Sequence, residues 1–353
     1  MPRIDALLRH LVDLGGSDLH LSAGAPPVFR VNGRLQKARH PPLDPAEVED
    51  LLYEILSDRE IGRLEADGDL DFAYGAEGVG RFRGNAFVHR KGYGAAFRWI
   101  PASPPDLGQL GHPPVVAELA LAQRGLVVVT GPTGSGKSTT LAAMIHRRNQ
   151  ERADHVITLE DPLEFLHEDG RCLIHQREVG RHASSFAAGL RAALREDPDV
   201  LLVGEMRDTE TIAMALTAAE TGMLVLGTLH TQSAAKTVDR IIDAFPAGQQ
   251  DQVRAMLAES LRGVVAQVLL RRADGRGRVA GLEILVNVPA VGHLIREGKT
   301  FQIPSVIQTG RRQGMQLLDQ HLLELVNTKA ISPEEALRHA QNRALFERMI
   351  TAP

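Results

Sequence analysis

A phosphate-binding loop is the strongest chemical signal in this sequence. Its residues are Gly131, Pro132, Thr133, Gly134, Ser135, Gly136, Lys137, Ser138 and Thr139. The apolar run Leu126–Thr130 precedes the loop, and residues 139–145 have a helical composition. Glycines allow successive backbone N–H groups to point at one anion, beside the positive end of the following helix. The sequence therefore predicts a nucleoside triphosphate site rather than a glycine-rich turn that binds nothing.

Two side chains of this loop have predicted roles. Lys137 would reach the β- and γ-phosphates of ATP, and the hydroxyl of Ser138 would ligate Mg²⁺. Hydrolysis also requires a carboxylate near the γ-phosphate and positive charge that stabilises the transition state. In an α/β sheet, such groups are expected beside the loop, at the carboxyl ends of the strands.

One predicted strand, Val200–Val203, is followed by Gly204 and then by Glu205. Because Glu205 is the first carboxylate past the end of this strand, we predict that it is the general base; a solvated, structural glutamate is the alternative. Asp197 and Asp199 precede the same strand. At a rise of about 3.3 Å per residue they would lie about 15–20 Å from Glu205, so we expect them to cap or terminate local structure.

A second predicted strand ends at Leu159 and leads directly into an acidic segment. Glu160 and Glu164 are placed to hold water or Mg²⁺. The dipeptide Asp161-Pro162 between them is typical of an ordinary turn.

A histidine follows the apolar run Met223–Leu229. At that place His230 could hydrogen-bond the γ-phosphate and report its loss. The alternative is a histidine that caps the strand or pairs with a neighbouring carboxylate.

Arginines are the remaining source of positive charge. The meander of alternating strands predicted between residues 69 and 100 carries Arg81, Arg83, Arg90 and Arg98. Most surface arginines are merely solvated, but a neighbouring domain that moves can deliver one of them as an arginine finger.

The elements that must position these residues fall into two regions. Residues 1–100 show a helical apolar pattern from Ile4 to Val12, a hairpin signal at Asn32-Gly33, and alternating strands over 69–74, 80–89 and 94–100. They predict a small α+β domain. A proline-rich linker is expected over 101–116.

Residues 117–353 have a different pattern. Continuous apolar runs at Leu126–Thr130, Val156–Leu159, Val200–Val203 and Met223–Leu229 alternate with helices. Such runs are typical of a parallel sheet covered on both faces. From Val253 onward we expect a mostly helical chain, broken by a hairpin around residues 272–278. The fold class is therefore α/β.

Composition narrows the function classes. The chain has 353 residues, 43% of them hydrophobic, so a globular two-domain protein is expected. Its net charge of −4 disfavours nucleic acid as a partner. The only cysteine, Cys172, excludes an internal disulfide and fits a reducing cytoplasm. The charged start predicts no signal peptide, and no apolar run approaches the roughly 20 residues that span a bilayer.

Taken together, these segments resemble the secretion-superfamily ATPases, and within them the type IV pilus retraction ATPases. The likeness covers nearly the whole chain. Ser17–Ser22, Gly80–Arg83 and Phe97-Arg98 match the family's N-terminal strands. The later family motifs are matched by Gly131–Thr140 (Walker A), Leu159–Phe165 (Asp box), Arg195–Asp208 (Walker B) and Thr221–Thr231 (His box).

The resemblance implies an ATPase with a PAS-like N-terminal domain and a RecA-like C-terminal domain that carries further helices. By the same resemblance, Glu205 is the catalytic carboxylate, Glu160 and Glu164 support it, and His230 contacts the phosphate region. Arg83 and Arg98 become the candidate fingers. The implied assembly is a homohexameric ring that uses ATP and Mg²⁺. It would act in the cytoplasm on an inner-membrane platform protein of the pilus, without a membrane span of its own and in some systems beside a second pilus ATPase.

Two departures from the family pattern bear on function. Met223 stands where the family usually has a second histidine. The late element Ala290–Glu297 keeps the start and end of the retraction motif but has Gly292 and His293 in place of its central Arg-Asn pair. An accessory retraction ATPase is therefore the close alternative. Assembly or secretion ATPases are less expected, because they generally carry a further N-terminal domain and often a four-cysteine metal site.

Two alternatives have no motor role in a pilus. A nucleotide-gated binding module would hydrolyse little ATP, and the acidic residues beside the loop argue against it. A DNA translocase would need a basic pore, which the charge balance disfavours.

Overall fold

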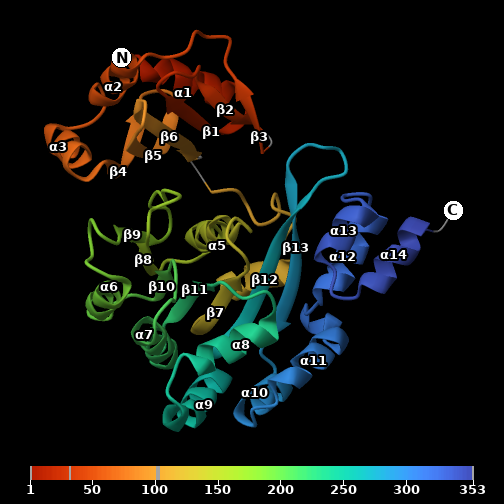
Figure 1. Cartoon of the computed structure of the whole chain (residues 1–353). Coiled ribbons are helices and arrows are strands. Elements are labelled where there is room, and N and C mark those ends of the chain that lie inside the picture. The colour runs from red at the N-terminus through yellow and green to blue at the C-terminus, as the bar shows by residue number, and fades with distance from the viewer. Residues whose placement is uncertain (1, 32, 101–103, 352–353) are drawn as a thin grey trace. The chain divides into compact units, whose positions relative to one another are not determined.

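The structure, a computed structural model, describes residues 2–31, 33–100 and 104–351 (Figure 1). The chain divides into two compact units, Met1–Ser103 and Pro104–Pro353. Asn32 of the predicted hairpin turn and residues 101–103 of the predicted linker lie outside the described residues.

The first unit contains a six-stranded sheet in the order β3-β2-β1-β6-β5-β4, and all of its neighbouring strands are antiparallel. The strands are β1 (Gly16–Ser22), β2 (Val28–Val31), β3 (Arg34–Lys37), β4 (Asp69–Ala76), β5 (Gly80–His89) and β6 (Gly92–Ile100). The predicted meander is confirmed as β4, β5 and β6.

Three helices pack on this sheet: α1 (Ile4–Asp13), α2 (Pro45–Tyr53) and α3 (Asp58–Asp67). Leu8 and Leu11 of α1 join Phe82 and Phe97 in one buried cluster, which makes that sheet face the core of the unit. The sequence did not predict α3, because its charged sequence buries only Leu64. A capping box between Ser57 and the side chain of Glu60 nevertheless starts that helix.

The second unit is built on a seven-stranded sheet in the order β13-β12-β7-β11-β10-β8-β9. The strands are β7 (Gly125–Thr130), β8 (His155–Glu160), β9 (Leu173–Glu178), β10 (Val200–Val203), β11 (Leu224–Leu229), β12 (Leu261–Arg271) and β13 (Arg278–Val286). Only the β12–β13 pair is antiparallel. The four parallel strands predicted from apolar runs are confirmed as β7, β8, β10 and β11.

The prediction of a mostly helical chain after Val253 is wrong over residues 261–286. The predicted hairpin is present, but its strands β12 and β13 are long. The strand β12 also pairs in parallel with β7, one position in from the edge strand β13. The sequence also gave no prediction for β9, whose side chains are mostly not buried. An edge strand of this kind lacks the continuous apolar signal of a central one.

Helices cover both faces of this sheet. On one face α4 (Pro114–Ala120) and α5 (Lys137–Glu151) share a buried cluster with the strands. The other face carries α6 (Phe186–Ala193), α7 (Thr209–Glu220), α8 (Ala234–Asp243), α9 (Gln250–Ser260), α10 (Pro289–Arg296) and α11 (Ile303–Thr309) (Figure 1). This coverage explains why each residue of β7 and β11 is buried.

The chain ends in three further helices, α12 (Leu318–Asn327), α13 (Pro333–His339) and α14 (Arg343–Thr351). They pack on Leu270 of β12 around a separate cluster that includes Leu322 and Phe346. In the part of the chain that the structure describes, no helix is long and apolar enough to cross a membrane.

Candidate active site

The phosphate loop joins the end of β7 to the start of α5, as the sequence predicted. Gly131 has φ 146°, and a Cβ there would lie 2.2 Å from the carbonyl oxygen of Gln267 in β12. Gly136, the N-cap of α5, has φ 88°. Only glycine adopts these conformations without strain. Any side chain at Gly131 would therefore push the loop away from the sheet.

The ammonium group of Lys137 lies against the loop. Its Nζ donates to the carbonyl oxygens of Gly131 at 3.0 Å and of Pro132 at 3.2 Å. Burial lowers the pKa of Lys137, whereas the charges of Glu205 and Glu164 act to raise it. These two predicted carboxylates are thus within electrostatic reach of the lysine.

The loop also contains an unsatisfied polar group. Ser135 is 2% exposed, and its Oγ has no hydrogen-bond partner among the residues that the structure describes. A buried hydroxyl without a partner is rare in folded proteins, and it fits a loop built to bind a polar ligand. Ser138 and Thr139 follow in the first turn of α5 and are half-buried.

A magnesium ion at this place would need phosphate oxygens as ligands. Within the described ranges, no group of three or more His, Cys, Asp or Glu side chains could hold a metal ion. Mg²⁺ usually binds few protein ligands and keeps waters and substrate phosphates in its shell. The Ser138 hydroxyl on the first turn of α5 fits that pattern.

Glu205 follows β10 and contacts the side chains of Arg207 and His230. Its Oε1 lies 2.6 Å from Nε of Arg207 and 2.9 Å from Nε2 of His230. The glutamate side chain is 19% exposed, against 69% for Arg207. Burial acts to raise the pKa of Glu205, but Arg207 and His230 outweigh it and hold the pKa below its usual value. Glu205 is therefore an ionised carboxylate at neutral pH.

His230 lies at the end of β11, the strand next to β10. Its contact with Glu205 matches the alternative that the sequence left open, a histidine paired with a neighbouring carboxylate. The adjacent Thr231 shares a hydroxyl contact of 2.7 Å with Thr130 at the end of β7 and one of 2.6 Å with Thr237 of α8. The ends of β7 and β11 and the start of α8 are thereby joined.

The two glutamates of the acidic segment at the end of β8 lie in different environments. Glu160 accepts hydrogen bonds from Thr158 at 2.7 Å and from Gln176 at 3.3 Å. Burial raises the pKa of Glu160 to about 7, despite those two hydrogen bonds. Glu164 is exposed. The Asp161-Pro162 peptide between them is cis and lies in a bend, where the sequence predicted a turn.

Asp199 lies at the other end of β10 from Glu205. Its carboxylate accepts the backbone N–H of His155 at 2.8 Å, where β8 begins. Asp199 therefore stabilises the start of two paired strands, as the sequence predicted. Asp197 lies in the segment before β10 and has φ 53°.

The candidate arginines of the first unit, Arg83 and Arg98, face each other across β5 and β6. Arg98 donates from Nε to Oδ1 of Asp18 at 2.9 Å, and Arg30 approaches the other oxygen of Asp18 at 3.7 Å. Side chains alternate along a strand, so these charged groups lie on the sheet face opposite the buried Phe82 and Phe97. The Arg98 side chain is 66% exposed.

Sequence reasoning missed two residues behind the loop, His112 and Gln267, and gave no role to a third, Thr140, at the end of the Walker A match. They form hydrogen bonds that end on the carbonyl oxygen of Ser135. Gln267 is 132 positions from Ser135 in the sequence. No local motif marks a contact of that range, so only the strand order could have revealed it.

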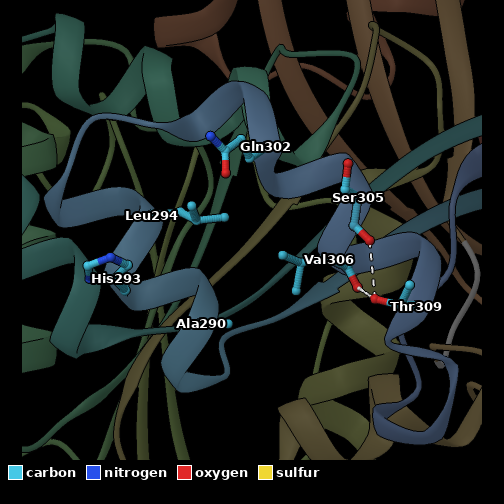
Figure 2. A pocket seen from close by; sticks show the side chains of 7 residues that line it. All are labelled: Ala290, His293, Leu294, Gln302, Ser305, Val306 and Thr309. Atoms are coloured by element: carbon cyan, nitrogen blue, oxygen red, sulfur yellow. Dashed lines mark hydrogen bonds between the residues drawn. The ribbon is translucent and has the colours of Figure 1, made fainter.

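A hollow between α10 and α11 is lined by residues of the late element, including His293 and Leu294 (Figure 2). Gln302, Ser305 and Thr309 lie on its other side. None of the candidate catalytic residues lines it. It is therefore separate from the phosphate loop.

Comparison with known proteins defines the class. The family model described as "Type II/IV secretion system protein" matches residues 1–351. The chain belongs to this family, and its α/β fold is that of a secretion ATPase.

Two relatives and one solved structure specify the likeness. The chain is 51% identical to the type IV pilus retractation ATPase PilT of Pseudomonas aeruginosa, over 96% of this chain and 98% of that protein. It is 40% identical to the type IV pilus ATPase PilU of the same organism, over 96% of this chain and 88% of the relative. The crystal structure of the pilus retraction motor PilT with bound ADP superposes with a TM-score of 0.90 at 45% identity, covering 98% and 99% of the two chains.

Proposed function

We propose that this chain is a Mg²⁺-dependent ATPase motor that powers type IV pilus retraction and thereby twitching motility. The observation that carries the proposal is 51% identity to a pilus retraction ATPase along 98% of that relative. The ADP bound to the similar PilT structure supports nucleotide binding. The arrangement of Lys137 and Glu205 supplies the chemistry for hydrolysis.

In this proposal the phosphate loop holds the triphosphate of ATP. Its backbone N–H groups and Lys137 bind the phosphate oxygens, and Ser138 holds Mg²⁺. The ion supplies charge neutralisation at the β- and γ-phosphates when it is bound.

Glu205 accepts the proton of the attacking water. Arg207 and His230 both contact Oε1, so we assign the second oxygen, Oε2, to the water. The two contacts hold the carboxylate in one orientation, and they lower the pKa of Glu205 so that it stays ionised. Glu164 supports the site from its place near Lys137, Glu160 supports it from the end of β8, and His230 contacts the phosphate region.

Arg83 and Arg98 supply the positive charge that the transition state requires. Their side chains are 40% and 66% exposed on the sheet face opposite Phe82 and Phe97, where a long guanidinium group can reach a ligand.

The remaining architecture follows from the same family likeness. Residues 1–100 form a PAS-like domain and residues 117–353 a RecA-like domain with a helical end, joined by the linker 101–116. The functional form is a homohexameric ring that acts in the cytoplasm and reaches the inner membrane through a platform protein. Closing and opening of the subunits during ATP turnover turn that partner.

The second candidate is an accessory retraction ATPase that acts beside another motor. The observation that favours it is the changed centre of the late element, Gly292 and His293. A Cβ at Gly292 would lie 3.2 Å from the carbonyl oxygen of Ala258, so the α9–α10 contact leaves little room for a side chain there. The match to the relative named PilU is also extensive.

Deletion of the gene tests whether the motor retracts pili or assembles them. A retraction motor is dispensable for building pili, so we expect many surface pili and no twitching. Cells without pili would indicate an assembly motor, and normal twitching an accessory or redundant one. A Mg²⁺-dependent phosphate-release assay on the purified chain tests the enzyme activity separately, because a nucleotide-gated binding module would release little phosphate.

A further inference from the structure

A chain of hydrogen bonds runs from the segment before α4 to the phosphate loop. Nε2 of His112 lies 3.0 Å from Oγ1 of Thr140, and this hydroxyl donates to Oε1 of Gln267 at 2.9 Å. The Nε2 amide group of Gln267 donates to the carbonyl oxygen of Ser135 at 2.6 Å. These contacts connect α5, β12 and the loop.

Three of the residues in this series of hydrogen bonds are shielded from water. Thr140 is 1%, Ser135 2% and Gln267 3% exposed. A buried polar group that loses its partner cannot replace it with solvent, so the loss destabilises the arrangement. Each member therefore depends on the next for its position.

We infer that Gln267, oriented by Thr140 and His112, is a positioning residue that sets the phosphate loop for nucleotide binding. The inference rests on the proposed ATPase function and adds residues that lie behind the loop.

The geometry of the peptide bond explains how Gln267 acts. In a trans peptide the C=O group and the following N–H group point in opposite directions. By holding the Ser135 carbonyl toward β12, Gln267 turns the N–H of Gly136 away from β12. Gly136 is the N-cap of α5, where backbone N–H groups form an anion site. Gln267 thus fixes the direction of one phosphate-binding donor.

The proton positions follow from the same contacts. The Thr140 hydroxyl has one hydrogen and donates it to Gln267, so it must accept from His112. Burial lowers the pKa of His112 to about 4, which keeps the ring neutral. Its proton is therefore on Nε2, the nitrogen with the shorter contact; Nδ1 lies 3.4 Å from the carbonyl oxygen of Leu110.

The close fit of the loop on β12 is a second observation. The Gly131 position would place a Cβ 2.2 Å from the backbone oxygen of Gln267, and the Gly136 position one 3.2 Å from its Nε2. Two glycines of the loop are thus in contact with the same residue. Gln267 supports the loop at both of its ends.

Substitutions of the two middle residues of this hydrogen-bond series, Gln267 and Thr140, test the inference in the full-length protein. Gln267→Met approximately keeps the shape of the side chain and removes both hydrogen bonds of its amide group. Thr140→Val keeps the shape and removes only the hydroxyl. We expect each to weaken binding of ADP with Mg²⁺ about tenfold, equal to about 1.4 kcal/mol. The KM for ATP should rise by a similar factor while kcat stays within about threefold, because Glu205 is unchanged. Thr140→Ser, which retains the hydroxyl, should bind as the wild type does.

Gln316→Met is the matched control. Gln316 also donates from Nε2 to a backbone carbonyl, that of Leu282 at 3.1 Å, but it does not contact the loop. Its substitution should lower stability without changing ADP affinity. Equal losses in Gln316→Met and Gln267→Met, or wild-type affinity in Gln267→Met and Thr140→Val, overturn the inference alone. If Gln267→Met does not fold, Thr140→Val and Thr140→Ser decide it. A wild-type protein that binds no ADP overturns the proposed function and the inference with it.

Discussion

Replacement of Glu205 by Gln tests the centre of the proposed mechanism. The amide keeps the shape of the side chain and an oxygen for Arg207 and His230, which now lie at 2.6 and 2.9 Å from Oε1. It cannot accept a proton from water. Loss of a general base costs about 10²–10⁴ in rate. At 1.36 kcal/mol per factor of ten, the barrier should rise by about 3–5 kcal/mol.

Nucleotide binding should respond in the opposite way. Glu205 is close enough to Lys137 to influence its pKa, so its negative charge also repels a bound triphosphate. Neutralising Glu205 removes this repulsion, and ADP or ATP should bind at least as tightly as in the wild type. Titration calorimetry with ADP and single-turnover phosphate release, measured on the same preparation, separate the two effects.

Asp197→Asn is the matched control for Glu205→Gln. It makes the same carboxylate-to-amide change before the start of β10, and asparagine tolerates the observed φ of 53°. Its turnover should stay within about twofold of the wild type. A Glu205→Gln protein that turns over within about tenfold of wild type would refute the assignment of Glu205 as the base.

Three further predictions concern other residues of the site. Lys137→Ala should weaken ADP binding about 10–100-fold, since hydrogen bonds to charged groups contribute about 1.5–3 kcal/mol; unchanged affinity by calorimetry contradicts its role. The double change Arg83→Ala and Arg98→Ala should lower turnover about 10³-fold with ADP affinity retained, as expected for loss of an arginine finger, and unchanged turnover refutes that role. Glu160→Gln should gain stability relative to the wild type as the pH rises from about 5 to 8. In the wild type the pKa of Glu160 is about 7 in the folded state and near 4.5 in the unfolded state, so protonation of Glu160 favours the folded state. This stabilisation is complete below about pH 4.5 and is lost as the pH rises through about 7. Melting temperatures at both pH values measure the gain, the exposed Glu259→Gln is the control, and a constant difference between wild type and Glu160→Gln contradicts the shift.

Much of the sheet that holds the site was predictable from sequence. The apolar strands β7, β8, β10 and β11 are continuous hydrophobic runs, and the residues after their carboxyl ends lie near one another because the strands are parallel. This rule alone brought Glu205 and His230 to neighbouring strand ends, where they now form a contact.

The missed features depend on contacts between distant parts of the chain. The strand β12 lies between α9 and β13 in sequence, and its place beside β7 is determined only by tertiary pairing. Gln267 therefore had no visible partner in the sequence. Likewise, the high pKa of Glu160 follows from its burial, which no spacing of residues reveals.

The two arginine partners of Asp18 have a consequence for reversibility. Asp18 is 9% exposed and contacts both Arg98 and Arg30. If Arg98 swings out to a phosphate, Arg30 remains beside the carboxylate, so Asp18 is not left as an uncompensated buried charge, which would be strongly destabilising. In this movement Arg98 exchanges one anionic partner, the Asp18 carboxylate, for another, the phosphate. On the proposed finger role of Arg98, the Asp18 carboxylate would attract the guanidinium back once phosphate has left.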